Sequence, residues 1–140
     1  MNIKIKLSEG AIMPSYSKEG DAGLDLTAIS KTFNYDYNYI EYGTGVHVEI
    51  PEGYVGLVFP RSSISKYGIS LSNSVGVIDS NYRGEIKFRF RRLAFSKNVY
   101  NIGDRIGQLI IIPYPKINFI LTENLSETSR GAGGFGSTGK

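Results

Sequence analysis

Apolar and polar residues alternate with a period of two at three places in this chain. The stretches IKIKL (3–7), VHVEI (46–50) and IKFRF (86–90) each place an apolar side chain at every second position, with polar or charged side chains between. Successive side chains of a β-strand point to opposite faces, so this period is that of a strand with one buried face. No stretch keeps the helical period of 3.6 for three turns. The alternation therefore predicts half-buried β-strands.

Three further stretches are short, apolar and rich in β-branched residues, which is expected of strands covered on both faces: YVGLVF (54–59), VGVI (75–78) and IGQLIII (106–112). Clusters of Gly, Pro, Asn and Ser separate the predicted strands. The Tyr-rich stretch 33–42 is typical of an exposed hairpin or strand edge, and residues 61–67 are expected to form a turn or two of helix. The predicted fold class is all-β, a sandwich or barrel.

Composition limits the possible functions. The 140 residues suffice for one domain that buries about two-thirds of the surface of its unfolded chain. The chain has no cysteine and a single histidine, His47, so Cys-ligated and multi-histidine metal sites are excluded and any metal is expected to have oxygen ligands. A net charge of +3 suits an anionic small molecule or a nucleic acid. No apolar run spans a membrane and the start alternates, so we expect a cytoplasmic protein, or one of the host-cell cytoplasm if the chain is viral.

The stretch RGAGGFGSTGK (130–140) matches two glycine patterns of nucleotide-binding loops. Both patterns need a helix after the glycines, with its N-terminus facing the phosphates, and no helix follows here. A frayed terminus would explain the glycines but not Arg130 and Phe135. These two residues favour a flexible arm that carries a phosphate-binding cation and an aromatic ring, and that closes over a site built elsewhere.

Four polar segments stand at the ends of predicted strands, and each has a structural explanation beside a functional one. Asp25, in DAGLDLTA, is either a turn carboxylate or a site residue. Ser62, in PRSS, either caps a short helix or binds phosphate oxygens. Asp79 and Tyr82, in VIDSNYRG, stand at the mouth of a predicted hairpin, which is either an ordinary turn or a site. Gln108 interrupts an apolar strand, so its amide either satisfies backbone groups or binds a ligand.

Taken together, AGLDLTA, PRSS, NSVGVIDSNYRG, RIGQLIIIP and RGAGGFGSTG, in this order and spacing, resemble the five motifs of the homotrimeric dUTP pyrophosphatases, the dUTPase family. The resemblance spans residues 21–139. It implies a jelly-roll-like β-barrel with one short helix, assembled as a homotrimer with active sites at the subunit interfaces. It also implies hydrolysis of dUTP to dUMP and pyrophosphate with Mg²⁺, which limits uracil incorporation into DNA and supplies dUMP for dTMP synthesis. Asn81 departs from the family pattern, in which many members have an Asp.

The third motif implies the groups that recognise the nucleoside and activate water. Asp79 would be the general base that deprotonates the water attacking the α-phosphorus. Tyr82 would lie against the deoxyribose and leave no room for a ribose 2′-hydroxyl. The uracil edge would be bound by further residues of the same hairpin: Asn73, Val77, Ile78 and Lys87.

The other motifs of the body imply the groups that bind the triphosphate. Arg61, Ser62 and Ser63 would hold phosphate oxygens, and Ser62 would also act in catalysis by stabilising the oxygen that bridges the α and β phosphates. Gln108 would help to hold the water and phosphate network. Asp25 would contact Mg²⁺ through coordinated waters, since Mg²⁺ gives up water reluctantly.

The fifth motif implies a mobile arm of residues 130–140 beside a catalytic body of residues 1–129. The arm would reach the site of a neighbouring subunit, with its arginine on the γ-phosphate and its phenylalanine over the uracil ring. The arm residues expected to contact the substrate are Arg130, Phe135, Gly136 and Ser137.

Three alternatives compete with this interpretation. A related dCTP deaminase would share the fold but would activate water against the base. A non-catalytic trimeric regulatory protein would use an exposed surface such as residues 33–42. A nucleic-acid stripe would use Lys87, Arg89, Arg91 and Arg92, of which the first three would share one face of a strand. Phe88 and Phe90 are expected on the opposite face, where they cannot stack on bases beside these cations, so we expect no stable nucleic-acid binding.

Overall fold

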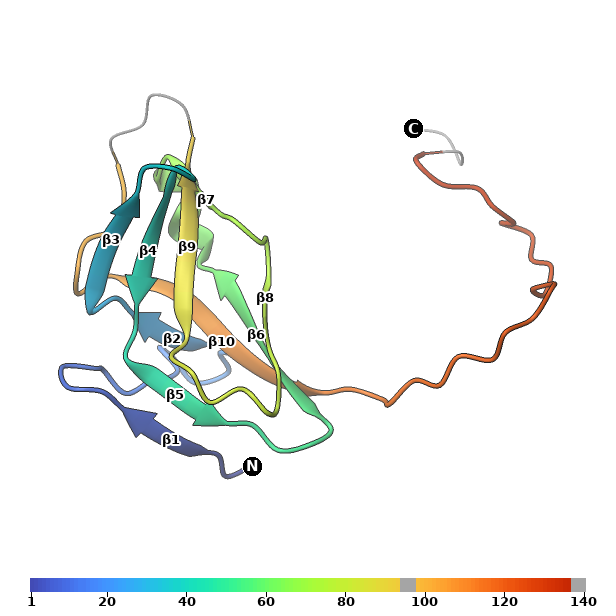
Figure 1. Ribbon diagram of the computed structural model, residues 1–140, viewed down its shortest axis with the longest axis horizontal. Coiled ribbons are helices and arrows are strands. Elements are labelled where there is room, and N and C mark those ends of the chain that lie inside the picture. Colours follow the sequence, from blue (N-terminus) through green and yellow to red (C-terminus); the bar gives the residue numbers. More distant parts are fainter. Residues whose placement is uncertain (94–97, 137–140) are drawn as a thin grey trace.

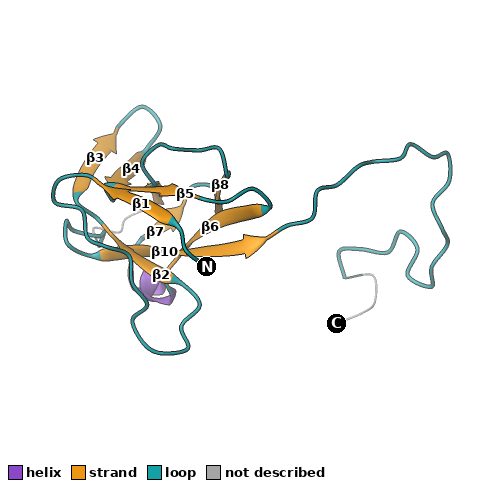
Figure 2. Cartoon of the chain, turned by 90° about the horizontal axis from the view of Figure 1, so that it is seen from below, coloured by secondary structure: helices purple, strands orange, loops and turns teal. Residues whose placement is uncertain are grey.

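The computed structural model describes residues 1–93 and 98–136. Its strands are, in chain order, β1 (Lys4–Leu7), β2 (Leu24–Thr27), β3 (Ser30–Asn34), β4 (Tyr39–Gly43), β5 (Val46–Glu49), β6 (Tyr54–Pro60), β7 (Ile69–Leu71), β8 (Gly76–Ile78), β9 (Lys87–Arg92) and β10 (Arg105–Pro113). A short 3₁₀ helix, η1 (Ser62–Lys66), lies between β6 and β7. Strands and loops make up nearly all of the described chain (Figure 2), which confirms the all-β prediction. No helix in the described residues is long and apolar enough to cross a membrane.

The strands form three antiparallel sheets. Two sheets have four strands, in the orders β2-β10-β6-β8 and β3-β4-β9-β7, and β1 pairs with β5 as a separate ribbon. Each four-stranded sheet combines strands from distant parts of the sequence, and the two sheets pack over a common core (Figure 1). This is the jelly-roll-like fold that the resemblance implied.

The alternation along β9 supplies the centre of the core. Phe88 and Phe90 are buried, whereas the cations next to them point outward, as the period of two predicted. Phe90 packs edge-on against Tyr42 and Tyr100, with ring centroids 5.8 and 5.5 Å away. The Tyr42 hydroxyl donates to the Tyr100 carbonyl at 2.9 Å, so this buried polar group is satisfied. Burial raises the pKa of Tyr42 to about 12.

Two local predictions are confirmed and one is wrong. β3 and β4 form the hairpin predicted for the Tyr-rich stretch, with Tyr35 and Tyr37 exposed near its tip. The helix predicted over residues 61–67 is η1. The prediction that the VGVI strand is covered on both faces is wrong, because β8 is an edge strand that pairs only with β6 and leaves Val77 62% exposed.

The chain leaves the sheets after β10. Residues 114–136 contain no strand and run away from the body (Figure 1). Apolar side chains along this segment are exposed, among them Phe119 and Leu121. The last described strand ends at Pro113, and the boundary between body and arm after residue 129 stays a prediction.

Candidate functional site

The hairpin around β8 forms one wall of a pocket of about 530 Å³. Every body residue predicted from the third motif lines it: Asn73, Val77, Ile78, Asp79, Tyr82 and Lys87. Asn73 precedes β8, Asp79 and Tyr82 follow it, and Lys87 begins β9. The structure therefore brings these six residues together, while the roles expected of them stay predictions.

Two backbone features shape the hairpin. Ser74 has a φ of 61°, a conformation that non-glycine residues rarely adopt, and it forms the tight turn that leads from Asn73 into β8. Gly76 lies directly against Val58 of β6, because a Cβ at Gly76 would come within 2.4 Å of the Val58 Cγ2 atom. This close approach keeps β8 paired with β6 and holds the pocket wall in place.

Tyr82 closes the turn that follows β8. Its backbone N–H donates to the Asp79 carbonyl at 3.1 Å, and its hydroxyl donates to the Glu85 carbonyl at 3.0 Å. The ring packs on Gly84, since a Cβ there would lie 2.3 Å from the Tyr82 hydroxyl oxygen. Tyr82 is 43% exposed, so the ring is fixed on one side and open to a ligand on the other.

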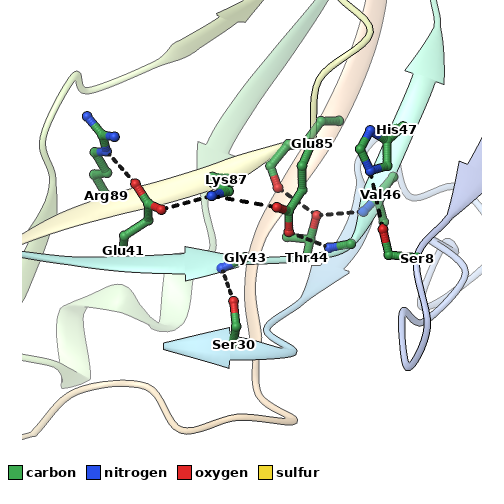
Figure 3. A network of polar contacts seen from close by, with 12 residues as sticks. Ser8, Ser30, Glu41, Gly43, Thr44, Val46, His47, Glu85, Lys87 and Arg89 are labelled. Atoms are coloured by element: carbon green, nitrogen blue, oxygen red, sulfur yellow. Dashed lines mark hydrogen bonds and ion pairs between the residues drawn. The ribbon is translucent and has the colours of Figure 1, made fainter. Parts of the chain in front are cut away.

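The outer faces of β4 and β9 add a charged wall to the same pocket (Figure 3). Glu41 accepts hydrogen bonds from Lys87 Nζ at 3.0 Å and from Arg89 Nε at 2.8 Å. Partial burial raises the pKa of the Glu41 carboxyl, but the hydrogen bonds and charges of the two cations outweigh burial and leave this pKa below its ordinary value. At neutral pH the wall thus holds one carboxylate between two fixed cations.

Glu41→Gln is expected to lower the free energy of unfolding by about 1 kcal/mol at neutral pH, because two cations lose their shared partner. The pKa of Glu41 is lowered in the folded state, so its contribution is full above the ordinary value of 4.5 and is lost as the pH falls through the folded value. Urea unfolding of both proteins should show a difference at about pH 7 that shrinks at about pH 3. An equal difference at both pH values would contradict this prediction.

A second group of predicted residues surrounds Asp25 on β2. Its Oδ1 accepts from Arg61 Nε at 3.0 Å, and its Oδ2 accepts from Arg105 Nη1 and Ser17 Oγ, both at 2.8 Å. The Asp25 side chain is only 12% exposed, so these bonds offset the cost of removing its charge from water. The bond to Asp25 uses Nε of Arg61, which leaves the two terminal nitrogens of the guanidinium to a ligand.

Gln108 on β10 stands beside this carboxylate. It pairs with Asp25 across the two strands, and its Nε2 donates to the Pro60 carbonyl at 3.3 Å. Its side chain packs on Gly23, where a Cβ would lie 2.2 Å from the Gln108 Oε1 atom. The amide therefore does satisfy a backbone group, and it is also positioned next to the predicted phosphate-binding residues.

The predicted phosphate ligands follow one another at the end of β6. Arg61 occupies the N-cap position of η1 and makes no side-chain capping bond. The explanation of Ser62 as the N-cap is therefore wrong. Ser62 and Ser63 are the first two residues of the helix, directly after Arg61.

The described residues contain no group of three or more His, Cys, Asp or Glu side chains that could hold a metal ion. The predicted metal contact, Asp25, is ion-paired with Arg61 and Arg105 through its two oxygens. One carboxylate that already carries two guanidinium groups does not fit a directly bound divalent cation, which needs several free oxygen ligands.

The described arm residues that were predicted to contact the substrate lie apart from both groups. Arg130 Nε donates to the Gly133 carbonyl at 3.0 Å within a local turn. Phe135 is fully exposed with a φ of 52°, and Gly136 follows with a φ of 83°. Figure 1 shows this segment away from the sheets. Ser137 lies outside the described residues.

One chain thus holds the predicted site residues in three places. β2, which carries Asp25, and β8, at the hairpin pocket, are the opposite edges of one four-stranded sheet, about 14 Å apart at the usual strand spacing. The described part of the arm, residues 130–136, lies away from both.

The residues of these groups that were not predicted as site residues include Ser17, Glu41, Glu85 and Arg105. Arg105 stands in the same motif as Gln108, and Glu85 directly follows the third motif, so closeness in sequence was an available signal for both. Ser17 and Glu41 lie outside all five motifs. Glu41 reaches the site through the pairing of β4 with β9, and Ser17 reaches Asp25 from the loop before β2, next to the isolated bridge between Ser15 and Asp25.

Comparison with known proteins gives matches over nearly the whole chain. The dUTPase family model matches residues 9–139. The deoxyuridine 5'-triphosphate nucleotidohydrolase of Escherichia phage T5 is 43% identical, with 98% of each chain covered, and that of Finegoldia magna is 42% identical, with 99% of each covered.

Solved structures give matches of the same extent. A dUTPase variant of Staphylococcus bacteriophage 80alpha with dUpNHpp has a TM-score of 0.79 at 26% identity, with 99% of each chain covered. A dUTPase variant from phage phi11 of S. aureus, described with a structural Mg(II) ion, has a TM-score of 0.73 at 24% identity, with 89% of this chain and 98% of that chain covered.

Proposed function

The chain belongs to the dUTPase family, and we propose that it hydrolyses dUTP to dUMP and pyrophosphate. The observation that carries the proposal is the pocket beside β8, because all six body residues that the third motif assigns to the nucleoside and to water activation line it. The reaction limits uracil incorporation into DNA and supplies dUMP for dTMP synthesis.

The hairpin pocket binds the deoxyuridine part of the substrate. Asn73, together with the hairpin backbone near Val77, Ile78 and Lys87, binds the uracil edge. The ring of Tyr82 lies against the deoxyribose. Because this ring is packed on the hairpin backbone, it forms a fixed wall that leaves no room for a ribose 2′-hydroxyl.

Asp79 accepts a proton from the water that attacks the α-phosphorus. A bond forms between the water oxygen and phosphorus while the bond to the α,β-bridging oxygen breaks, and pyrophosphate leaves with the electron pair. Ser62 stabilises the bridging oxygen as charge develops on it, and Arg61 and Ser63 hold other phosphate oxygens. Gln108 helps to hold the attacking water and the phosphates.

Asp25 is the residue that would hold Mg²⁺, through coordinated waters, and the metal would supply charge neutralisation at the phosphate oxygens of the substrate. The pairing of Asp25 with two arginines supports a contact to the metal through coordinated waters and not a direct bond.

The active form is a homotrimer with sites between subunits. A width of about 14 Å separates the hairpin pocket from the Asp25 group within one chain, which is too far for both to act on one α-phosphorus. The hairpin of one copy and the Asp25 group of another would complete a site. The exposed apolar side chains of residues 114–136 also favour a segment that packs on a second copy.

The arm, residues 130–140, closes over a site that the bodies, residues 1–129, have formed. Arg130 binds the γ-phosphate and Phe135 covers the uracil ring, with Gly136 and Ser137 in contact with the substrate. The glycines of this segment support the motion, since two of them, Gly131 and Gly136, have positive φ. Closure excludes water other than the attacking molecule.

The test is pyrophosphate release from dUTP, UTP, dTTP and dCTP, each measured with and without Mg²⁺. We expect release from dUTP in strong preference to the other three nucleotides, at a rate that depends on Mg²⁺. Ammonia release from dCTP would identify a deaminase instead. Binding of dUTP without release of pyrophosphate would identify a non-catalytic binding protein.

Two of the cations of β9 already have a carboxylate partner. Lys87 and Arg89 are paired with Glu41, and the phenylalanines beside them are buried. These contacts support the expectation that no stable nucleic-acid complex forms.

A further inference from the structure

Glu85 stands at the point where the active-site hairpin joins the body of the protein (Figure 3). Its Oε1 accepts a hydrogen bond from the Gly45 N–H at 2.8 Å, in the corner between β4 and β5. Its Oε2 lies 3.7 Å from Lys87 Nζ, and Lys87 is itself bonded to Glu41. The Glu85 side chain is 25% exposed, so the carboxylate is held against the body and not left in solvent.

The residue after Glu85 is bound to the same corner. The buried Thr44 hydroxyl donates to the Ile86 carbonyl at 2.6 Å, and the Ile86 N–H donates to the Val46 carbonyl at 2.8 Å. Two successive residues of the hairpin, one by its side chain and one by its backbone, therefore fix this end of the loop to the core. Only the Glu85 carboxylate in this set can be changed without touching a core side chain.

The backbone of Glu85 is also the anchor of the Tyr82 ring. The Tyr82 hydroxyl donates to the Glu85 carbonyl at 3.0 Å, and the ring rests on Gly84 between them. A shift of the Glu85 backbone would therefore move the phenol oxygen, and with it the exposed face of the ring. The link runs from the Gly45 N–H through the Glu85 carboxylate and backbone to the Tyr82 ring.

We propose that Glu85 is a positioning residue for sugar selection: its hydrogen bond to the Gly45 N–H holds the Tyr82 ring where it excludes a 2′-hydroxyl. The inference rests on the proposed function, in which that ring lies against the deoxyribose. The Tyr82 ring can exclude the one added oxygen atom of ribose only if the ring stays in place. If the ring becomes more mobile, ribose can enter the pocket while deoxyribose still fits. The expected consequence of losing Glu85 is thus a gain of UTP hydrolysis relative to dUTP hydrolysis.

The experiment compares kcat/KM for dUTP and UTP in three variants. Glu85→Ala removes the acceptor for the Gly45 N–H, and we expect the dUTP/UTP selectivity to fall by at least about tenfold. Glu85→Gln keeps an oxygen that can accept this bond, so it should retain most of the selectivity. Glu49→Gln, which changes a carboxylate paired with Lys4 on the separate β1–β5 ribbon, is the matched control and should leave the selectivity unchanged.

A double-mutant cycle tests the route of the effect. Tyr82→Phe keeps the ring but removes the hydroxyl that bonds to Glu85, and it leaves the corner with Gly45 intact. If Glu85 acts through this ring, the loss of selectivity in the double variant should be clearly smaller than the product of the two single losses. If thermal unfolding shows that Glu85→Ala does not fold, Glu85→Asp, which keeps the charge but shortens the side chain that accepts from the Gly45 N–H, gives the same directional test.

Two results would overturn the inference: unchanged dUTP/UTP selectivity in Glu85→Ala, whether or not kcat/KM falls equally for both nucleotides, or a loss of selectivity in Glu85→Gln as large as in Glu85→Ala. An equal fall would indicate a purely structural role. These results are distinct from a failure of the proposed function, which would appear as absence of pyrophosphate release from dUTP in the unaltered protein.

Discussion

Asp79→Asn is expected to leave dUTP binding nearly unchanged and to lower kcat by a factor of about 10² to 10⁴. The amide has the shape of the carboxylate, and the turn does not depend on the side chain, because the Asp79 backbone carbonyl accepts the bond from the Tyr82 N–H. The amide cannot take a proton from water near neutral pH. Pyrophosphate release at saturating dUTP, measured beside equilibrium binding of dUTP, separates the two effects.

The matched control is Asp36→Asn, which changes an exposed carboxylate in the loop between β3 and β4 and should alter neither quantity. Full turnover in Asp79→Asn would show that the base lies elsewhere. A large loss of binding at unchanged kcat would show that Asp79 holds the substrate and does not activate water.

The strands with one buried face were predictable because their signal is local. The alternation in β1, β5 and β9 reports which side chains of each strand meet the core, and nearby residues carry all of that information. The hairpin of β3 and β4 was predictable for the same reason. The pairing of β10 with both β2 and β6 was not, because the partners of an apolar strand are chosen by packing between distant segments.

The error over β8 has a physical cause. VGVI has the composition of a strand buried on both faces, but Val77 lines the pocket and is exposed. Positions that contact a ligand or another subunit favour apolar side chains, just as positions in the core do. Composition alone therefore cannot tell a core strand from a strand that lines a site.

The candidate site also has a part that the sequence predicted and a part that it did not. The motifs predicted which residues line the hairpin pocket, because those residues are close in sequence. They did not predict that Asp25 is held by Arg61 and Arg105, which come from the ends of two other strands. The resemblance assigned Asp25 to the metal through coordinated waters, which stays a prediction, and the structure adds that both its oxygens are engaged by cations. That charge pairing depends on the register of β2 with β10 and has no signature along the chain.

Removing residues 130–140 is expected to leave the fold intact and to lower kcat/KM for dUTP by at least about 10²-fold. The body should be unaffected because residues 114–136 lie outside the sheets, so the thermal midpoint should not change. The activity should fall because the loss of one charge-assisted contact, from Arg130 to a phosphate, costs about 1.5–3 kcal/mol, and each 1.4 kcal/mol is tenfold in rate. Loss of the ring of Phe135 and of water exclusion adds to this.

Point variants distinguish loss of the Arg130 guanidinium from loss of the whole segment 130–140. Arg130→Ala should reproduce about tenfold or more of the loss, since it removes the cation and keeps the glycines. Lys116→Ala removes a cation from the same exposed segment but outside the arm, and should leave kcat/KM unchanged. If the truncated protein kept full activity, no lid would be needed. If Lys116→Ala and Arg130→Ala lowered activity equally, the effect would be one of net charge, which added salt would abolish for both. A loss specific to Arg130 that persists in salt would place its guanidinium on the substrate.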